Sequence, residues 1–370
     1  MSTLQPPRKI LLNPGPATTS DRVKHAQVVS DICPREREFG AMVSAVREKL
    51  VRVPQGGHDY SAVLLGGSGT AAMEACLSSV IAADGHVLIA SNGAYGERAI
   101  KIAQAYGIAH TALRQSWLAP IDLDAVAAAL AAEPRTTHLF FVHHETTTGL
   151  LNPFERLAGL CRERGIATIV DAVSSYAGMA IDLGRAPVDY LFSSSNKCVQ
   201  GFAGLGFVLA RRASLTATER HPRRGVYLNL FDNWKQQEAD GQFLFTPPVQ
   251  VVYALDAALD ELFEETPAAR YARYAACYDV LMARMDALGV RALLPREVHS
   301  KLLTAFHEPA LPGYGFDAMH DYLYARDITI YPGKLGDQGT FRIANIGALV
   351  PADLARFADA LGEYLAQLHG

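Results

Sequence analysis

Three groups of anion-binding or reactive residues each follow a strongly apolar stretch of the sequence. The first is the loop GGSGT, Gly66 to Thr70, whose backbone N–H groups, hydroxyls and following helix can hold a phosphate. The second is the carboxylate of Asp171, directly after the run TIV, and the third is the amine of Lys197, before a glycine-rich return. The glycine loop alone is weak evidence, because its spacing matches neither common phosphate-loop pattern.

Together these groups fit one small cofactor, pyridoxal phosphate. The glycine loop would hold its phosphate, Asp171 would pair with its pyridinium nitrogen, and Lys197 would join its aldehyde as a Schiff base. A lysine between an apolar strand and a glycine-rich turn is partly desolvated, which lowers its pKa and favours the nucleophilic amine. Tyr95, after a second apolar run, would stack on the cofactor ring, and Thr146, after a third, would hydrogen-bond the ring hydroxyl.

The elements that must position these residues alternate between strands and helices. Nearly continuous apolar runs predict a mostly parallel sheet, and the periodic stretches between them predict helices over both of its faces. We therefore predict an α/β fold with the reactive residues at the carboxyl ends of strands, where open α/β sheets bind ligands. The predicted strands are 62–65, 86–90, 138–143, 167–172, 189–195 and 206–210, and the predicted helices are 70–83, 94–106, 123–132 and 154–164.

A second, smaller α+β domain is predicted in the C-terminal part of the chain. Pro247 and Pro248 interrupt the alternating pattern, and the sequence then becomes strongly helical. Strand-like runs follow near 328–331 and 340–343, and a last amphipathic helix spans 351–368. The predicted division is a large cofactor-binding domain over residues 18–254, a small domain over residues 255–370, and an N-terminal segment of residues 1–17 that joins them.

The composition disfavours several classes of protein. The 370 residues include 34 Lys plus Arg and 38 Asp plus Glu, and a net charge of -4 argues against a dedicated nucleic-acid binder. With 49% hydrophobic residues the chain can bury a large core, yet no apolar run is long enough for a membrane span. The polar start and five widely spaced cysteines without a CxxC pair favour a cytoplasmic protein with free thiols.

Seven motifs resemble, in the same order, those of fold type I aminotransferases from the group that includes alanine-glyoxylate and 2-aminoethylphosphonate transaminases. The similarity runs over nearly the whole chain. Within the group, SNGAYG, ETTTGLLNP and above all NKCVQG look like the 2-aminoethylphosphonate:pyruvate transaminase family. The motifs are NPGP (13–16), GGSGT (66–70), SNGAYGER (91–98), HHETTTG (143–149), VDAVSS (170–175), SSNKCVQG (194–201) and FRIANIG (341–347).

The resemblance implies a role for each matched position. Lys197 and Asp171 would be the catalytic residues, and Arg342 would grip the acidic end of the substrate with its guanidinium fork. A homodimer with shared active sites is also implied, because Thr246 matches a position from which the neighbouring subunit reaches the phosphate. The implied cofactor contacts are Ser68, Gly69, Thr70, Tyr95, Thr146, Asp171, Lys197 and Thr246, and the implied substrate contacts are Arg342, Asn13, Gly15 and Arg35.

One segment departs from the family pattern. The phosphonate-degrading enzymes are expected to carry an aromatic and acidic run after the first cysteine, whereas this chain has DICPREREFG, Asp31 to Gly40. The run looks more like a branch associated with phosphonate biosynthesis. Its Arg35 would be either a second anion contact or a solvated loop residue. The departure leaves the physiological direction and the amino acceptor open.

The activity implied by the resemblance is a ping-pong transamination. 2-Aminoethylphosphonate and pyruvate would give phosphonoacetaldehyde and alanine, with Lys197 moving the proton on the carbon that bears nitrogen. Another small-substrate transaminase, such as an alanine- or serine-glyoxylate enzyme, shares the cofactor residues and is the nearest alternative. A cysteine desulfurase is disfavoured, because residues 327–342 contain no thiol.

An alternative of another class is a metal hydrolase built on His143, His144 and Glu145. Adjacent side chains on a strand point to opposite faces and the HExxH spacing is absent, so no metal site is predicted. A catalytically silent binding protein of the same fold is disfavoured as well, because the reactive lysine, the aspartate and the arginine are all present.

Overall fold

The centre of the protein is a seven-stranded sheet in which most neighbouring strands run parallel. In this computed structural model, which describes residues 7–333, 335 and 339–368, the strand order is β2-β10-β9-β8-β5-β3-β4. Only β10 runs antiparallel to its neighbours, β2 and β9. The strands are β2 (Tyr60–Gly67), β3 (His86–Ser91), β4 (His110–Arg114), β5 (Thr136–Val142), β8 (Ala167–Asp171), β9 (Tyr190–Ser194) and β10 (Gly204–Arg211).

Six of these strands confirm the apolar runs of the sequence, and the seventh, β4, was not predicted. Strand β4 has the sequence HTALR, and none of its residues is fully buried. It lies at the edge of the sheet, beside β3 only. A half-exposed edge strand does not need a continuous apolar run, so its sequence carries no strong signal.

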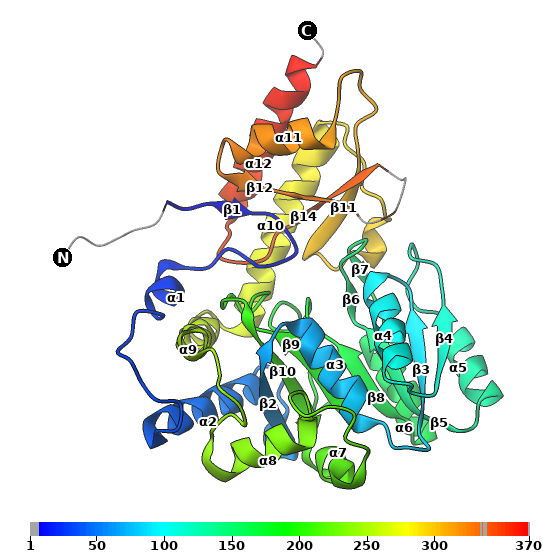
Figure 1. The fold of residues 1–370 in the computed structure, drawn as a ribbon. Coiled ribbons are helices and arrows are strands. Elements are labelled where there is room, and N and C mark those ends of the chain that lie inside the picture. The colour runs from blue at the N-terminus through cyan, green and yellow to red at the C-terminus, as the bar shows by residue number, and fades with distance from the viewer. Residues whose placement is uncertain (1–6, 334, 336–338, 369–370) are drawn as a thin grey trace.

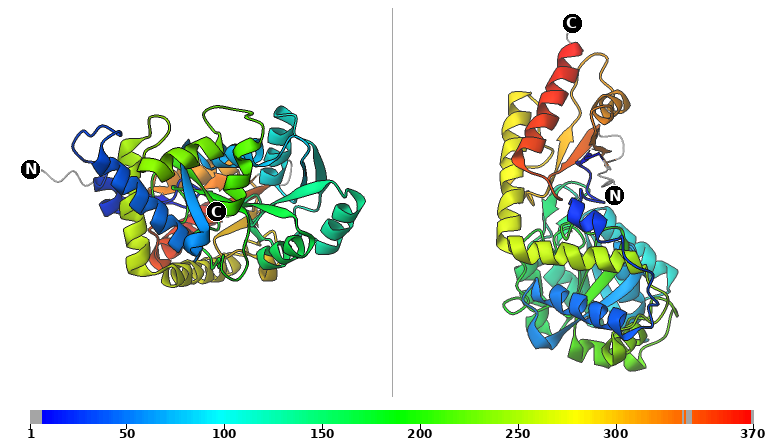
Figure 2. Two further views of the ribbon diagram at one scale, coloured as in Figure 1. Left: turned by 90° about the horizontal axis from the view of Figure 1, so that it is seen from below. Right: turned by 90° about the vertical axis from the view of Figure 1, so that its left-hand side faces the viewer.

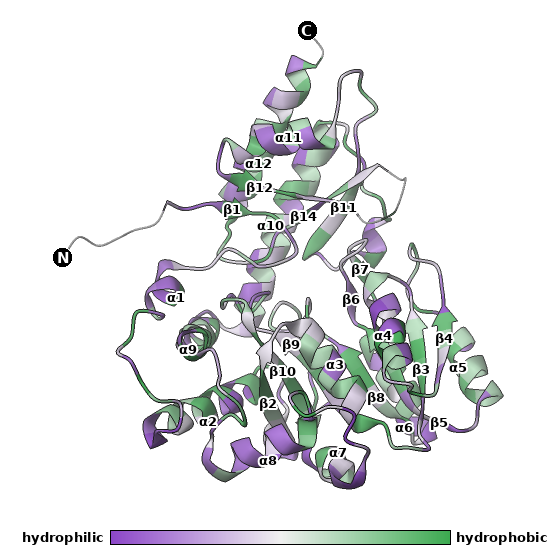
Figure 3. Cartoon of the chain, in the orientation of Figure 1, coloured by the Kyte–Doolittle hydropathy of each residue, from purple (hydrophilic) through white to green (hydrophobic). Residues whose placement is uncertain are grey.

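Helices cover both faces of the sheet, because alternate strand residues point to opposite sides. On one face Val63, Ile89 and Phe140 pack with α3 and α4, and on the other Leu64 and Phe141 pack with α2, α6 and α9. In the hydropathy colouring of Figure 3, much of the central sheet is green, and the helices around it carry both green and purple residues. The helices are α2 (Arg37–Arg52), α3 (Gly69–Val80), α4 (Ala94–Ala105), α5 (Leu123–Ala132), α6 (Phe154–Arg164), α7 (Arg212–Ala217), α8 (Leu230–Asp240) and α9 (Val249–Glu265). The predicted α/β architecture is confirmed.

A smaller sheet with its own core lies above the large one in Figure 1. Its order is β11-β14-β13, and its strands are antiparallel. The predicted strand-like runs near 328–331 and 340–343 and the last helix are found there. The elements are α10 (Pro267–Ala287), β11 (Leu303–His307), α11 (Phe316–Tyr324), β12 (Ile328–Thr329), β13 (Tyr331–Pro332), β14 (Thr340–Ala344) and α12 (Pro351–Gln367).

The predicted domain boundary after residue 254 falls inside helix α9. Buried residues on both sides of it, Ala254 and Leu255, belong to the core of the large sheet. Helix α10, whose Leu281 and Met285 belong to the core of the small sheet, begins only after Thr266. We therefore propose that the boundary between the two domains lies at Thr266. Figure 2 shows α9 beside the large domain and α10 rising from it.

The N-terminal segment links the two sheets. Strand β1 (Ile10–Leu11) pairs in parallel with β12 of the small domain. A few residues later, the N–H of Ala17 donates to the carbonyl of Asn196, next to Lys197, at 2.9 Å. Residues 7–17 thus contact elements of both sheets, the joining role of residues 1–17 stays a prediction, and residues 1–6 lie outside the described chain.

Several short helices, strands and turns lie between the longer elements. The short elements are α1 (Asp21–His25), β6 (His144–Glu145), β7 (Leu150–Leu151) and the 3₁₀ turns Gly57–Asp59, Thr218–Arg220 and Arg296–Val298.

No helix in the described part of the chain is both long and apolar enough to cross a bilayer. Four of the five cysteines are buried, Cys33 is exposed, and all five are free thiols.

Strand β2 lies at an edge of the sheet, and a side chain rather than a strand pairs with the backbone of its Leu64. The buried side chain of Gln237 on α8 accepts from the N–H of Leu64 at 2.9 Å and donates to its carbonyl at 2.8 Å, as a neighbouring strand would. Gln237→Leu should leave both groups unpaired and lower the free energy of unfolding by roughly 2–4 kcal/mol, measured by denaturant titration. The neighbouring Gln236→Leu, which loses only a contact to Asp240, should change it by less than about 0.5 kcal/mol.

Candidate active site

The predicted site residues gather at one edge of the large sheet, the edge that faces the small domain (Figure 1). Parallel pairing of β3, β5, β8 and β9 brings their carboxyl ends to this edge. Asp171 is the last residue of β8, and Lys197 follows the end of β9. Tyr95 lies in the first turn of α4, and Thr146 directly follows β6. The predicted placement at strand ends is therefore correct for these residues.

Asp171 is a buried carboxylate with one unpaired oxygen. Its side chain is near the centre of the sheet and only 3% exposed. One oxygen, Oδ1, accepts from the N–H of Val173 at 2.9 Å, whereas Oδ2 has no hydrogen-bond partner among the described residues. Burial raises the pKa of Asp171 to about 7, although the positive charges of Arg98 and Lys197 oppose the shift. Oδ2 is thus ready to accept from a cationic N–H donor.

Lys197 lies directly under the N-terminal segment. Its Nζ donates a hydrogen bond to the carbonyl of Pro14. Gly15 has φ +140°, and a Cβ placed on it would lie 2.6 Å from Lys197 Nζ, so only glycine fits there. The neighbouring Asn13 donates from Nδ2 to the carbonyl of Pro16, while its buried Oδ1 has no partner within the described chain. The structure thus brings the expected substrate contacts Asn13 and Gly15 to the reactive amine.

The glycine loop after β2 leaves the start of helix α3 open to an anion. Ser68 is the N-cap residue of α3, yet its exposed side chain makes no capping hydrogen bond, and Gly69 follows it with partial exposure. The hydroxyl of Thr70 accepts from Arg98 Nη1 at 2.8 Å, which adds a cation to the helix N-terminus. Sequence reasoning missed Arg98, because only the fold brings α4 against the loop.

Tyr95 is held by a buried carboxylate whose role was not predicted. Glu145 is fully buried, and its Oε1 accepts from the N–H of Thr147 at 2.9 Å, while its Oε2 accepts from the N–H of Tyr95 at 3.3 Å. Gly93 makes room for it, since a Cβ there would lie 2.2 Å from the Glu145 carboxyl carbon. The ring of Tyr95 contacts the Arg98 guanidinium at 4.9 Å. Burial raises the pKa of its hydroxyl, and the Thr146 side chain partly opposes the rise.

The two histidines of the rejected metal site make separate contacts. His143 Nδ1 lies 3.0 Å from the Ser175 hydroxyl, and His144 Nδ1 donates to the carbonyl of Ser174 at 2.9 Å. Burial lowers the pKa of His143 to about 3 and that of His144 to about 4, so both rings are neutral at pH 7. Across the described residues, no three His, Cys, Asp or Glu side chains are grouped to hold a metal ion.

Arg342 reaches the site from the small sheet. It lies in β14, is 2% exposed, and donates from Nε to the carbonyl of Pro332 at 3.0 Å and from Nη1 to the carbonyl of Thr146 at 3.1 Å. Its Nη2 has no hydrogen bond to a described residue. Burial lowers the pKa of the guanidinium, although Tyr95 and Glu145 favour its charge. Arg342 therefore presents a fixed cation beside Thr146, with the two N–H groups of Nη2 left for an anion.

Two predicted site residues, Arg35 and Thr246, do not lie at the strand ends with the others. Arg35 is exposed and donates to the carbonyls of Phe243 at 2.6 Å and Leu244 at 3.3 Å. Thr246 is exposed a short way along the same loop. Among the described residues, neither makes a hydrogen bond to another predicted site residue. Their expected contacts to substrate and phosphate remain predictions, and the loop before α2 that carries Arg35 contacts the loop that carries Thr246.

A cavity of about 560 Å³ lies at the opposite edge of the sheet and does not compete with this site. It opens beside Tyr60, at the start of β2, and two of the three arginines that line it are ion-paired. Arg47 and Arg212 both bind the carboxylate of Glu238. No reactive residue predicted from the sequence lines it.

The residues at the strand ends fit the predicted cofactor. The unpaired Oδ2 of Asp171 suits a pyridinium N–H, because a cation beside it offsets the cost of burying the carboxylate. The open N-terminus of α3, with Arg98 beside it, suits a phosphate. The amine of Lys197 suits an aldehyde. This donor set is too specific for a generic anion pocket.

The raised pKa of Asp171 predicts a pH-dependent stability in the cofactor-free protein. The pKa rises from 3.8 to about 7, so the folded protein holds this proton more tightly than the unfolded chain, and stability falls as pH rises across that range. Asp171→Asn removes this loss. We expect the variant to gain up to about 4 kcal/mol over the original protein between pH 4 and pH 8, by denaturant titration at each pH. A pH-independent difference would contradict the prediction.

Comparisons with known proteins agree with this geometry. The family model described as Aminotransferase class-V matches residues 20–348. A 2-aminoethylphosphonate--pyruvate transaminase of Syntrophobacter fumaroxidans is 41% identical over 353 residues, which cover 95% of this chain and 95% of that protein. One from Aeromonas hydrophila is 43% identical over 349 residues, 93% of this chain and 91% of that protein.

A solved structure shows the same fold. The alanine--glyoxylate aminotransferase of Nostoc sp. superimposes with a TM-score of 0.89 at 27% identity, covering 99% of this chain and 97% of that chain. The match extends through both the large and the small sheet. With a family model over most of its length and relatives above 40% identity, the chain belongs to the class V aminotransferases.

Proposed function

We propose that the protein is a pyridoxal phosphate-dependent transaminase that exchanges the amino group between 2-aminoethylphosphonate and pyruvate. The products are phosphonoacetaldehyde and alanine. The observation that carries this proposal is the near full-length similarity to relatives named for that reaction, at 41% and 43% identity. The cytoplasmic location and the physiological direction remain predictions from the sequence.

The residues at the strand ends support this chemistry. When bound, pyridoxal phosphate supplies an electron sink that stabilises the charge left on a carbon after it loses a proton. Asp171 Oδ2 would accept from the ring nitrogen and keep it cationic. Lys197 Nζ is the base that takes the proton from the carbon bearing nitrogen. The open N-terminus of α3 and Arg98 would hold the phosphate, and Tyr95 would stack on the ring.

Arg342 supplies the specificity for an acidic substrate. Its hydrogen bonds to Pro332 and Thr146 leave Nη2 as the donor for one oxygen of an anion. A phosphonate and a carboxylate both accept from a guanidinium, so the same residue serves 2-aminoethylphosphonate in one half-reaction and pyruvate in the other. Burial of Arg342 strengthens either contact, because less water competes for the charge.

A homodimer with shared active sites is part of the proposal. Val226 and Tyr227 are exposed apolar side chains beside the glycine loop, and the partly buried ring of Phe245 stacks on Tyr227 to complete the patch. The hydroxyl of Tyr227 donates to the carbonyl of Gly66 at 3.4 Å. Val226 is 78% exposed, which is unfavourable for a solitary chain. A second copy seated on this patch would bring its Thr246 toward the loop, as the family resemblance implies.

The proposed reaction predicts two separable spectral changes in the purified enzyme loaded with pyridoxal phosphate. Adding 2-aminoethylphosphonate without a keto acid should bleach the visible cofactor band, and adding pyruvate should restore it. Lys197→Ala should lose the band's response and show no turnover, because the base is gone. The measurement is absorbance with stopped-flow mixing. Bleaching only by alanine or serine would keep the transaminase and replace the substrate, and no cofactor band at all would refute the proposal.

The proposed dimer predicts a particle of twice the chain mass of 40.0 kDa. Val226→Glu should place a charge in the patch and shift the population toward monomers at low micromolar concentration, measured by sedimentation velocity. Leu118→Glu, an equally apolar position at 44% exposure away from the patch, serves as the matched control and should leave the mass unchanged. A monomeric original protein would contradict the shared site.

A further inference from the structure

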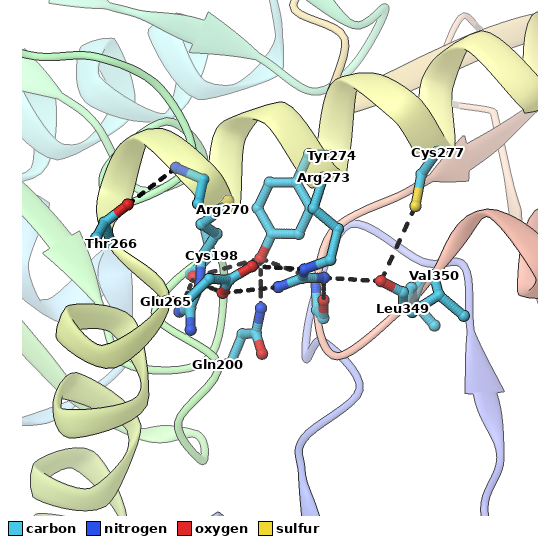
Figure 4. A network of polar contacts seen from close by, with 12 residues as sticks. Cys198, Gln200, Glu265, Thr266, Arg270, Arg273, Tyr274, Cys277, Leu349 and Val350 are labelled. Atoms are coloured by element: carbon cyan, nitrogen blue, oxygen red, sulfur yellow. Dashed lines mark hydrogen bonds and ion pairs between the residues drawn. The ribbon is translucent and has the colours of Figure 1, made fainter.

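A buried tyrosine on α10 contacts the turn that carries Lys197. Tyr274 is fully buried, and its hydroxyl accepts from Gln200 Nε2 at 2.7 Å and lies 3.4 Å from the carbonyl of Cys198, to which it donates. Figure 4 shows this tyrosine pointing from the helix into the turn. Arg270, one helical turn earlier, donates to the carbonyls of Cys198 and Val199. The turn after the reactive lysine is therefore held from the small-domain side.

The turn itself has an unfavourable backbone conformation. Gln200 has φ +69°, in the left-handed region that residues with a Cβ rarely adopt. Its N–H donates to the carbonyl of Lys197 at 2.9 Å, and the N–H of Gly201 donates to the carbonyl of Ser195 at 2.8 Å. Such a conformation persists only where surrounding contacts enforce it. The side-chain hydrogen bond from Gln200 to Tyr274 is such a contact.

The same tyrosine also contacts the segment that follows Arg342. The Tyr274 hydroxyl accepts from the N–H of Gly347 at 3.2 Å, and its main-chain carbonyl accepts from Asn345 Nδ2 at 2.8 Å. Strand β14, which carries Arg342, ends just before these residues. One side chain thus meets the turn of the reactive amine and the segment that continues from the anion-binding strand.

Next to Tyr274, a single carboxylate holds two guanidinium groups in one linked cluster. Glu265 accepts from Arg270 Nε at 2.7 Å and from Arg273 Nε at 2.6 Å. Arg273 also donates to the carbonyls of Gly347 and Leu349. All these contacts join α9 and α10 to the loops around the site (Figure 4). These linked ion pairs and hydrogen bonds make the geometry around Tyr274 rigid.

We propose that Tyr274 is a positioning residue that fixes the turn carrying Lys197 relative to the strand carrying Arg342. The inference rests on the proposed function, because it assigns these two groups to the base and the anion contact. A substrate anchored by its anion at Arg342 presents its amine-bearing carbon at a set distance. Tyr274 holds the base at that distance, and it touches neither cofactor nor substrate.

The test compares two tyrosines on the same helix. Tyr274→Phe removes the hydroxyl that joins the two segments. Tyr278→Phe, one helical turn later, removes a buried hydroxyl whose one hydrogen bond within the described residues goes to His299 Nδ1 at 2.8 Å, and it is the matched control. In the cofactor-loaded enzyme, Tyr274→Phe should slow bleaching by saturating 2-aminoethylphosphonate about tenfold, with cofactor still bound, whereas Tyr278→Phe should change it less than about twofold.

A second readout does not depend on the reaction. In the cofactor-free protein, hydrogen exchange of the Gln200 and Gly201 amides should accelerate at least tenfold in Tyr274→Phe and stay unchanged in Tyr278→Phe. Gln200→Asn tolerates the left-handed φ, yet its amide is one methylene too short for Tyr274. It should reproduce both effects and so guards against a Tyr274 variant that folds poorly.

The outcomes separate the two proposals. Equal slowing by Tyr274→Phe and Tyr278→Phe, or slowing without faster exchange at the turn, would show a merely structural role and overturn the inference. Faster exchange with unchanged bleaching would overturn it too. If the original protein reacts with no amine, the proposed function fails, and the exchange contrast still decides whether Tyr274 holds the Lys197 turn.

Discussion

The arrangement of the site depends on one electrostatic constraint, the burial of a carboxylate with only half of its hydrogen-bonding capacity used. Asp171 ends a strand in the middle of the sheet, where water is excluded, and among the residues that the structure describes Val173 alone donates a hydrogen bond to it. A charge in such a place is costly unless a cation neutralises it. The nearby Arg98 and Lys197 offset part of the cost, and a cationic ring nitrogen would offset the rest. Without the cofactor, the buried charge of Asp171 destabilises the protein, whereas with the cofactor the same charge stabilises the ring cation.

The other groups around that carboxylate come from both sheets. Lys197, Tyr95 and the glycine loop belong to the large sheet, whereas Arg342 belongs to the small one. Lysine and arginine have like charges, and neither attracts the other into place. Their positions must therefore be set by hydrogen bonds to neutral groups, such as the carbonyls of Pro14 and Thr146. Buried polar contacts between the two domains, such as those of Arg342 with Thr146 and of Tyr274 with Gln200, serve this purpose.

Local sequence signals predicted the strands and the strand-end positions well, and tertiary contacts account for most of what they missed. Apolar runs located Asp171 and Lys197, because a strand buried on both faces needs such a run. Edge strand β4 has no such requirement and was missed. Arg98 and Glu145 act on loops from other parts of the chain, so their spacing reveals nothing. Gln200 belongs to a motif noticed for its resemblance, but its left-handed conformation becomes visible only in the structure.

The pairing of β1 with β12 has a consequence for how the protein is made. Ile10 pairs with Ile328, so the segment over Lys197 leaves the ribosome long before its partner strand exists. At bacterial or eukaryotic elongation rates this delay is on the order of half a minute. During that time the large sheet can assemble, while β1 still lacks the strand with which it pairs. The link between the N-terminal segment and the small sheet can therefore form only when translation is nearly complete.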